Sequence, residues 1–305
     1  MRTSLGARRA NSTGAFIRSV RDNQSMPTFT DERGHEINYY EWLVPEPKAV
    51  VQILHGVGEH AGRYEHVAAA LNQAGYSVYA DDHLGHGHTG MAQWEGDRAK
   101  LGKLGPGGLR AAENAIEMLT AIIRQENPGT PLVLLGHSWG SLMAQRIINR
   151  EPKAYEAVVL TGSAYRMPGS MEGGDLNKAH KHLGDTGFEW LSRDLDVARA
   201  FVADELAFGG KVIDLFGPIE AVKLLGLPSK HLPAKLPLYI VSGSDDPLSI
   251  GHSVTKLGDA FRKRSGMTDV TVKIYQGARH EVFNETNKAE VLGDLVTWLD
   301  THFAK

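Results

Sequence analysis

The chain has 305 residues, of which 42% are hydrophobic and 23% are charged, and its formal net charge is -3. These values are typical of a globular protein that can bury a sizeable core, and they give no general attraction for nucleic acid. The sequence contains no cysteine, which excludes disulfides, thiolate metal sites and a cysteine nucleophile. No apolar run reaches the ~18 residues of a membrane-spanning helix.

The first 25 residues differ in composition from the remainder of the chain. They contain five arginines and one acidic residue, Asp22, and lack the apolar stretch of a secretory signal. We expect a disordered leader over residues 1–25, or a true start at Met26, and a folded domain over residues 26–305. An Arg-rich organelle transit peptide stays open as an alternative to a cytoplasmic protein.

From Met26 onward, segments with strand and helix patterns alternate. Short apolar or alternating runs predict strands at Glu36–Val44, Ala49–Gly56, Tyr76–Asp82, Pro131–His137, Ala157–Ala164, Pro237–Asp246 and Val270–His280. Amphipathic runs predict helices over residues 63–75, 107–129, 141–152, 249–265 and 287–303. This alternation indicates an α/β protein, with a mostly parallel sheet covered by helices on both faces.

One long stretch interrupts the alternation. Residues from about 165 to 231 contain no clear buried strand, but they include apolar segments with helical spacing. Such a long excursion between strands is too long for an ordinary loop. We therefore expect an inserted, mainly helical cap, called the cap segment below.

The sequence Gly136-His137-Ser138-Trp139-Gly140 has the form G-x-S-x-G. By itself this pattern is common in a glycine-rich chain. Here it follows a predicted buried strand and begins a predicted helix, which is the setting of a nucleophile elbow. A serine needs a histidine base, and the histidine needs a carboxylate to orient it.

Two later strand ends supply these partners. "SGSDDP" offers Asp245 and Asp246, and "GARHE" offers His280. Open α/β sheets place their sites at the carboxyl ends of strands, where all these residues are predicted to lie. The order serine, acid, histidine is the one that this type of fold uses.

From about Thr28 to the C-terminus, the chain resembles the monoacylglycerol lipase and lysophospholipase branch of the α/β-hydrolases. The matching stretches are "HGVGEHAGRY", "DDHLGHGHT", "GHSWGS", "SGSDDP" and "ARHEVFNE". The resemblance implies Ser138 as the nucleophile, His280 as the base and Asp246, rather than Asp245, as the acid. It also implies an oxyanion hole formed by the backbone N–H groups of Val57 and Trp139, each contributing about 3–4 kcal/mol.

The stretch "DDHLGHGH" (residues 81–88) contains enough histidine and aspartate to suggest a metal site. In the family it follows a strand and forms a G-H-G turn, so we expect Asp82 and His86 to fix this loop through hydrogen bonds. His55 is expected to brace the oxyanion loop. The sequence therefore predicts neither a metal nor a cofactor.

The resemblance implies a serine esterase or lipase that acts on a monoacylglycerol, a lysophospholipid or a simpler ester. A prolyl aminopeptidase-like or haloperoxidase-like hydrolase is the alternative enzyme, and a catalytically silent binding module is the alternative outside enzymes. The expected partner is a small ester or lipid, with peripheral membrane contact through the cap segment and no nucleic acid.

Overall fold

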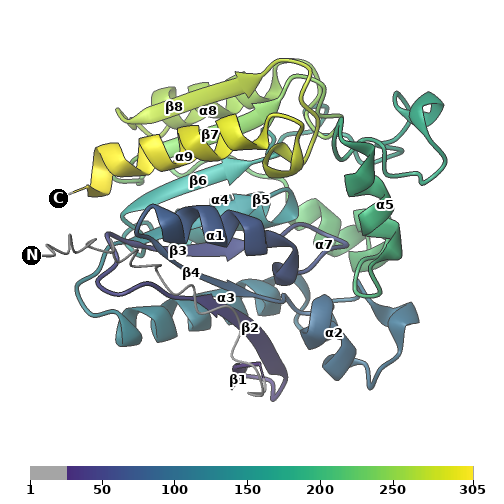
Figure 1. The fold of residues 1–305 in the computed structure, drawn as a ribbon, viewed down its shortest axis with the longest axis horizontal. Helices are drawn as coiled ribbons and strands as arrows, with labels where there is room; N and C mark the ends of the chain where they lie inside the picture. The colour runs from purple at the N-terminus through teal and green to yellow at the C-terminus, as the bar shows by residue number, and fades with distance from the viewer. Residues whose placement is uncertain (1–25, 305) are drawn as a thin grey trace, which may run out of the picture.

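The protein forms an eight-stranded sheet flanked by helices, as seen in a computed structural model that describes residues 26–304 (Figure 1). The strand order is β1-β2-β4-β3-β5-β6-β7-β8. The strands are β1 (Thr28–Thr30), β2 (Glu36–Trp42), β3 (Val50–Leu54), β4 (Ser77–Asp81), β5 (Leu132–His137), β6 (Ala157–Thr161), β7 (Leu238–Gly243) and β8 (Val270–Tyr275). β2 pairs antiparallel with β1 and β4, and every other pairing is parallel, which confirms the predicted class.

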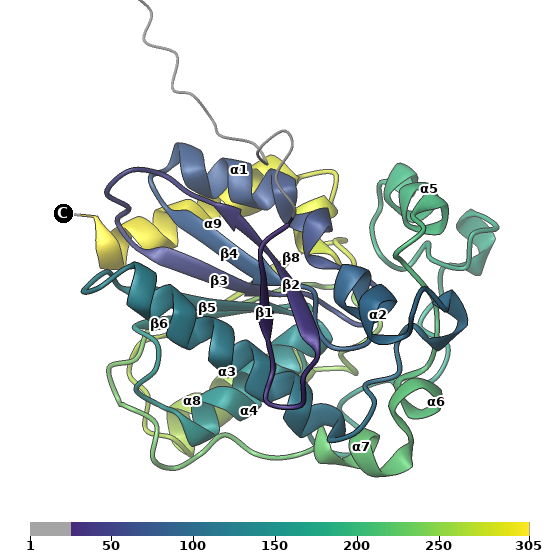
Figure 2. The ribbon, with the colours of Figure 1, turned by 90° about the horizontal axis from the view of Figure 1, so that it is seen from below.

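Helices cover both faces of this sheet (Figure 2). α1 (Glu65–Gln73) and α9 (Lys288–Phe303) lie on one face. The other face is covered by α3 (Gly108–Glu126), α4 (Trp139–Arg150) and α8 (Ser253–Lys263). Because the central strands are covered twice, every residue of β3, β4, β5, β6 and β7 is buried, which explains their continuous apolar runs.

Two short elements were not predicted. β1 has three residues, too few for an alternating pattern to be recognised. α2 (Gly87–Gln93) begins inside the histidine-rich stretch, which we expected to be a loop. Its two glycines lower its helix propensity, so the sequence does not indicate a helix there. Outside the cap segment there are also single turns of 3₁₀ helix: η1 (Ala61–Tyr64), η2 (Arg98–Lys100) and η4 (Val282–Asn284).

The cap segment lies between β6 and β7 and stands at the carboxyl end of the parallel strands, beside α2 (Figures 1 and 2). Its helices are η3 (Lys181–Leu183), α5 (Leu195–Ala203), α6 (Val212–Phe216) and α7 (Pro218–Lys223). More of it is loop than helix. Its limits as a domain remain a prediction, and the leader over residues 1–25 lies outside the described residues. Within residues 26–304, no helix is long and apolar enough to cross a membrane.

Candidate active site

Ser138 occupies a sharp turn between β5 and α4. Its backbone has φ 52° and ψ -123°, a positive-φ conformation that residues other than glycine rarely adopt. The turn is closed by glycines, because a Cβ on Gly140 would lie 2.2 Å from the carbonyl oxygen of Leu54, and one on Gly136 would lie 2.6 Å from that of Gly140. This geometry holds Ser138 at the N-terminus of α4, which favours negative charge.

His280 and Asp246 meet at the ends of the last two strands. The Nδ1 atom of His280 lies 2.9 Å from Oδ1 of Asp246, and both side chains are buried. The backbone N–H of Leu248 donates to the same carboxylate oxygen at 2.9 Å. Asp245 is exposed, and its carboxylate accepts a hydrogen bond from the Ser244 hydroxyl instead. The structure therefore brings Asp246, and not Asp245, to His280.

The surroundings of His280 suit a base. Since a carboxylate can only accept, the hydrogen bond to Asp246 places the proton on Nδ1 and leaves Nε2 with a free lone pair. Burial has the largest effect and lowers the pKa of His280, but the charge and hydrogen bond of Asp246, together with the charges of Glu281 and Glu59, outweigh it, so the pKa is raised above 6.5. The protonated imidazole is thus stabilised inside the protein.

The turn that contains Val57 packs against the nucleophile. A Cβ on the preceding residue, Gly56, would lie only 3.0 Å from Cβ of Ser138. The N–H of Trp139 lies in the first turn of α4, where no carbonyl of that helix is available to it. Among the described residues, neither Val57 nor Trp139 donates its backbone N–H to another protein group. Both donors are free for a ligand.

Ser138 and His280 line one cavity of about 120 Å³. Most of its wall is apolar, with the cap segment contributing Phe188, Trp190, Leu191, Phe201, Phe208, Val212 and Leu224 and the core contributing Val57, Trp139, Leu142 and Leu248. The Trp190 ring lies 4.8 Å from the ring of His280, between centroids. A mostly apolar cavity with a few polar groups is typical of a small-molecule site.

Segments of the cap bond to the loops around this cavity. Phe208 N–H donates to the Gly58 carbonyl at 2.9 Å, beside Val57. Glu281 N–H donates to the Leu191 carbonyl at 2.8 Å, next to His280. The cap segment therefore helps to hold the loops of the site in position and also covers the cavity.

The histidine-rich stretch braces the same region. Asp82 accepts hydrogen bonds from the N–H groups of Ala61 and His88, as expected for a residue that fixes this loop. His86 contributes differently: its Nδ1 bonds locally to the Leu84 carbonyl, and its ring stacks on Trp139 at 5.0 Å. No group of three or more histidine, aspartate or glutamate side chains within residues 26–304 is arranged to hold a metal ion.

His55 links two loops, in line with the bracing role expected for it. Its Nε2 accepts the His83 N–H at 3.0 Å, so its Nδ1 carries the proton and donates to the Gly56 carbonyl at 2.7 Å. Burial, reinforced by His83 and His86, lowers the pKa of His55 well below 6.5. His55 is therefore neutral near pH 7.

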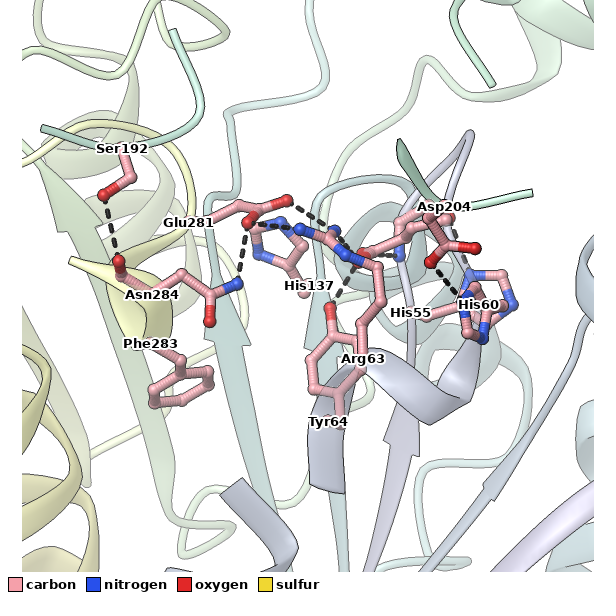
Figure 3. A network of polar contacts seen from close by, with 12 residues as sticks. His55, His60, Arg63, Tyr64, His137, Ser192, Asp204, Glu281, Phe283 and Asn284 are labelled. Atoms are coloured by element: carbon pink, nitrogen blue, oxygen red, sulfur yellow. Dashed lines mark hydrogen bonds and ion pairs between the residues drawn. The ribbon is translucent and has the colours of Figure 1, made fainter. Parts of the chain in front are cut away.

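A buried ionic cluster next to the site was not predicted (Figure 3). Arg63 forms ion pairs with Glu59 at 2.6 Å and with Glu281 at 2.7 Å. Glu59 falls within the matched stretch "HGVGEHAGRY", where the resemblance implies no chemical role for it. One feature of the sequence could have indicated the cluster. Arg63 and Glu281 are charged residues that fall within matched stretches, and charged residues that become buried are usually paired.

His137, which precedes the nucleophile, also faces this cluster. Its ring lies 4.8 Å from the ring of His280, and its Nδ1 lies 3.1 Å from the Thr161 hydroxyl. Burial and the neighbouring His280 lower the pKa of His137 to about 4, so it does not compete with His280 for a proton near pH 7.

Comparison with known proteins agrees with this geometry. The serine aminopeptidase family S33 matches residues 45–287. The monoacylglycerol lipase of Mycolicibacterium smegmatis is 33% identical over 93% of this chain and 99% of its own length, and the human monoglyceride lipase is 26% identical over 86% and 85%. A carboxyl esterase from Bacillus coagulans, solved with glycerol, has the same fold, with a TM-score of 0.80 and 22% identity over 92% of this chain and 99% of its own.

The family match covers far more than half of the chain and includes each strand-end loop described above. The alignments cover 99% of the Mycolicibacterium smegmatis enzyme and 85% of the human enzyme. The chain therefore belongs to the serine aminopeptidase S33 family of α/β-hydrolases, in its monoacylglycerol lipase-like branch.

Proposed function

We propose that this protein is a serine hydrolase that cleaves carboxylic esters of apolar acyl chains through an acyl-enzyme. The observation that carries the proposal is the buried His280–Asp246 pair, which opens into the same apolar cavity as Ser138. The names of its relatives, monoacylglycerol lipases and an esterase, support ester substrates.

The steps follow from the hydrogen bonds. Nε2 of His280 takes the Ser138 hydroxyl proton while Oγ attacks the ester carbonyl, and the oxyanion binds the N–H groups of Val57 and Trp139. Collapse of this intermediate breaks the C–O bond, and His280 gives its proton to the leaving alcohol. Water then attacks the acyl-enzyme in the same manner, releasing the acid and the free serine. Asp246 accepts the Nδ1–H of His280 throughout, and this sequence of steps needs no cofactor.

The substrate is a monoacylglycerol, a lysophospholipid or a simpler ester whose acyl chain occupies the apolar wall of the cavity. An aminopeptidase would need a free carboxylate to hold the substrate's ammonium group. The two buried carboxylates in the lining, Glu59 and Glu281, are already paired with Arg63. The third carboxylate in the lining, Glu172, is exposed and accepts the Gly174 N–H at 2.7 Å, so the buried part of the cavity favours ester over peptide substrates.

We also propose that α6 and α7 rest on a lipid surface, which makes the protein membrane-peripheral on the cytoplasmic side. Ile213, Ile219 and Val222 are 51%, 73% and 65% exposed. The exposed side chain of Lys211 flanks them and suits an anionic headgroup, whereas Lys223 is paired with Glu220 at 2.6 Å. Replacing Ile219 and Val222 with serine should reduce sedimentation with anionic vesicles while turnover of a soluble ester is unchanged. Unchanged sedimentation would refute the contact.

A fluorophosphonate probe and a panel of esters test the function. The wild-type protein should be labelled on Ser138 and should prefer apolar acyl chains over acetyl. Ser138→Ala should fold, escape labelling and lose about 10⁴-fold or more in kcat. A Ser138→Ala protein with near-normal ester turnover would exclude the mechanism, and turnover of peptides but not of esters would favour the aminopeptidase.

A further inference from the structure

Two loops bring reacting groups to the site from distant parts of the sheet. The oxyanion loop (residues 55–60) follows β3, and the histidine loop (residues 276–285) follows β8. Three strands, β5, β6 and β7, separate β3 from β8, so no strand pairing fixes one loop relative to the other. A direct contact between the two loops would fix the distance between the oxyanion hole and the base more tightly than the sheet alone.

Arg63 makes such a contact from the side of the cavity, and His66, whose Nε2 lies 3.0 Å from the Phe283 carbonyl, makes a second one. Arg63 lies in η1, directly after the oxyanion loop, and its guanidinium reaches across to Glu281 of the histidine loop (Figure 3). Nη1 and Nη2 donate to the two carboxylate oxygens of Glu281 at 2.7 and 2.9 Å, and Nη1 also donates to Glu59 at 2.6 Å. This planar, two-pronged bond fixes orientation as well as distance.

Each glutamate passes this constraint to a functional group. Glu59 accepts the N–H of Gly56 at 2.6 Å, and Gly56 is the residue before Val57. Glu281 directly follows His280 in the chain, and its remaining bonds run to the Asn284 amide and the Leu191 carbonyl. The three charged side chains therefore join the oxyanion loop to the histidine loop through hydrogen bonds, and each loop carries one functional group.

The glutamates have no other cation. Within the described residues, Glu59 and Glu281 form ion pairs with Arg63 only, and both are buried, with 3% and 5% of their surface exposed. Arg63 holds the pKa of Glu281 at about 2 despite its burial, so this carboxylate is charged at all working pH values. Two carboxylates and one guanidinium give this buried cluster a net negative charge. The cluster faces His280 and favours the protonated form of that histidine.

We propose that Arg63 is a positioning residue: through Glu59 and Glu281 it fixes the oxyanion loop against the histidine loop, so that donor and base act on one carbonyl. This inference rests on the proposed ester hydrolysis and deepens it. Arg63 itself touches neither Ser138 nor the substrate carbonyl in this role, and it acts through the two loops that it joins.

Arg63→Lys is the first test, because lysine keeps the charge but cannot bond both oxygens of Glu281 in one plane. The matched control is Arg150→Lys. Arg150 also joins a buried glutamate, Glu113, to a second one, Glu117, but between α3 and α4, away from the site. Turnover of a soluble p-nitrophenyl ester is measured per active site titrated with the fluorophosphonate probe, well below the thermal midpoint of each variant.

We expect Arg63→Lys to lower kcat per titrated site at least tenfold, with KM changed less than threefold, since a shift of about 1 Å in a reacting group is costly. Arg150→Lys should stay within twofold of wild type. Equal kcat per titrated site in wild type and Arg63→Lys would overturn the proposal, as would equal losses in the two lysine variants. Failure of the proposed function is distinct, because it would leave the wild type unlabelled by the probe.

Glu281→Gln provides a second readout, which also decides the matter if Arg63→Lys does not fold. The charged or titratable groups that face His280 are Asp246 after β7, Glu281 on its own loop, Glu59 and Arg63 after β3, and His137 at the end of β5. Removing one negative charge should move the acidic limb of kcat/KM to lower pH and also reduce the plateau. If the bridge only stabilised the fold, the acidic midpoint of the kcat/KM profile would stay at the pH of the wild type. An unmoved midpoint would therefore refute the proposal.

Discussion

Asp246→Asn replaces one carboxylate oxygen with an NH₂ group. It therefore removes the charge of the acid while nearly keeping the shape of the side chain. In this structure Oδ1 of Asp246 accepts from both His280 Nδ1 and the Leu248 N–H. An asparagine oxygen at the same place can keep both bonds, because both partners are donors. We therefore expect the His280 ring to keep its orientation and tautomer, and the loss in activity to report the missing charge.

The magnitude follows from the distance. Unit charges 2.9 Å apart attract by about 6 kcal/mol at an effective dielectric constant of about 20, and the side chains are too buried for solvent to screen them much. The amide dipole restores about 1–2 kcal/mol of this. The remaining loss of about 4–5 kcal/mol, if expressed in the transition state where His280 is cationic, corresponds to about 10³-fold in kcat.

The assay compares Asp246→Asn with Asp245→Asn, a neighbouring exchange of the same chemistry. Asp245 is exposed and bonds to Ser244, so its variant should stay within threefold of wild type. The acidic limb of Asp246→Asn should also move to lower pH, since the lost carboxylate raises the pKa of His280. A larger loss in Asp245→Asn, or an Asp246→Asn enzyme within tenfold of wild type, would refute the reasoning.

Three further outcomes follow from the structure. Gly140→Ala should lower the thermal midpoint and abolish turnover, because its Cβ would lie 2.2 Å from the Leu54 carbonyl oxygen. The control Gly293→Ala, on the exposed face of α9, should instead stabilise the folded protein by about 0.5–1 kcal/mol. In the wild type, kcat/KM should rise with pH through a midpoint above 6.5, because the base must be neutral and the pKa of His280 is raised; a midpoint below 6 would contradict this. Activity should survive dialysis against EDTA, and His83→Ala should keep most of its turnover; a chelator-sensitive enzyme restored by zinc would overturn the reading of residues 81–88.

The fold and the placement of the main site residues could be predicted because both depend on local rules. A nucleophile elbow needs glycines two residues before and after the serine, and Gly136 and Gly140 are where the clearance demands them. The carboxyl ends of parallel strands share one edge of the sheet, so the loops after β5, β7 and β8 had to meet. Sequence spacing alone was sufficient for these features.

The remaining features depend on contacts that no local pattern encodes. Arg63 and Glu281 are 218 positions apart, so their pairing is visible only after the sheet has been assembled. The cap segment was recognised by what it lacks, and its helices could not be delimited, because α6 and α7 have five and six residues, too few for a helical period. Some of its apolar residues pack on the site and on each other, whereas others, such as Ile219 and Val222, are exposed, and no repeating pattern separates the two groups.

The histidine-rich stretch shows why residue type alone is a weak guide to chemistry. A metal site needs several lone pairs that converge on one point. Here Nδ1 of His83 pairs with the Asp81 carboxylate at 2.7 Å, and Nδ1 of His86 is held by the Leu84 carbonyl. Burial lowers the pKa of His86 to about 3, so its ring is neutral and packs against Trp139 as an aromatic group would. The His86 ring therefore packs against the first turn of α4, which contains the N–H of Trp139, the proposed oxyanion donor.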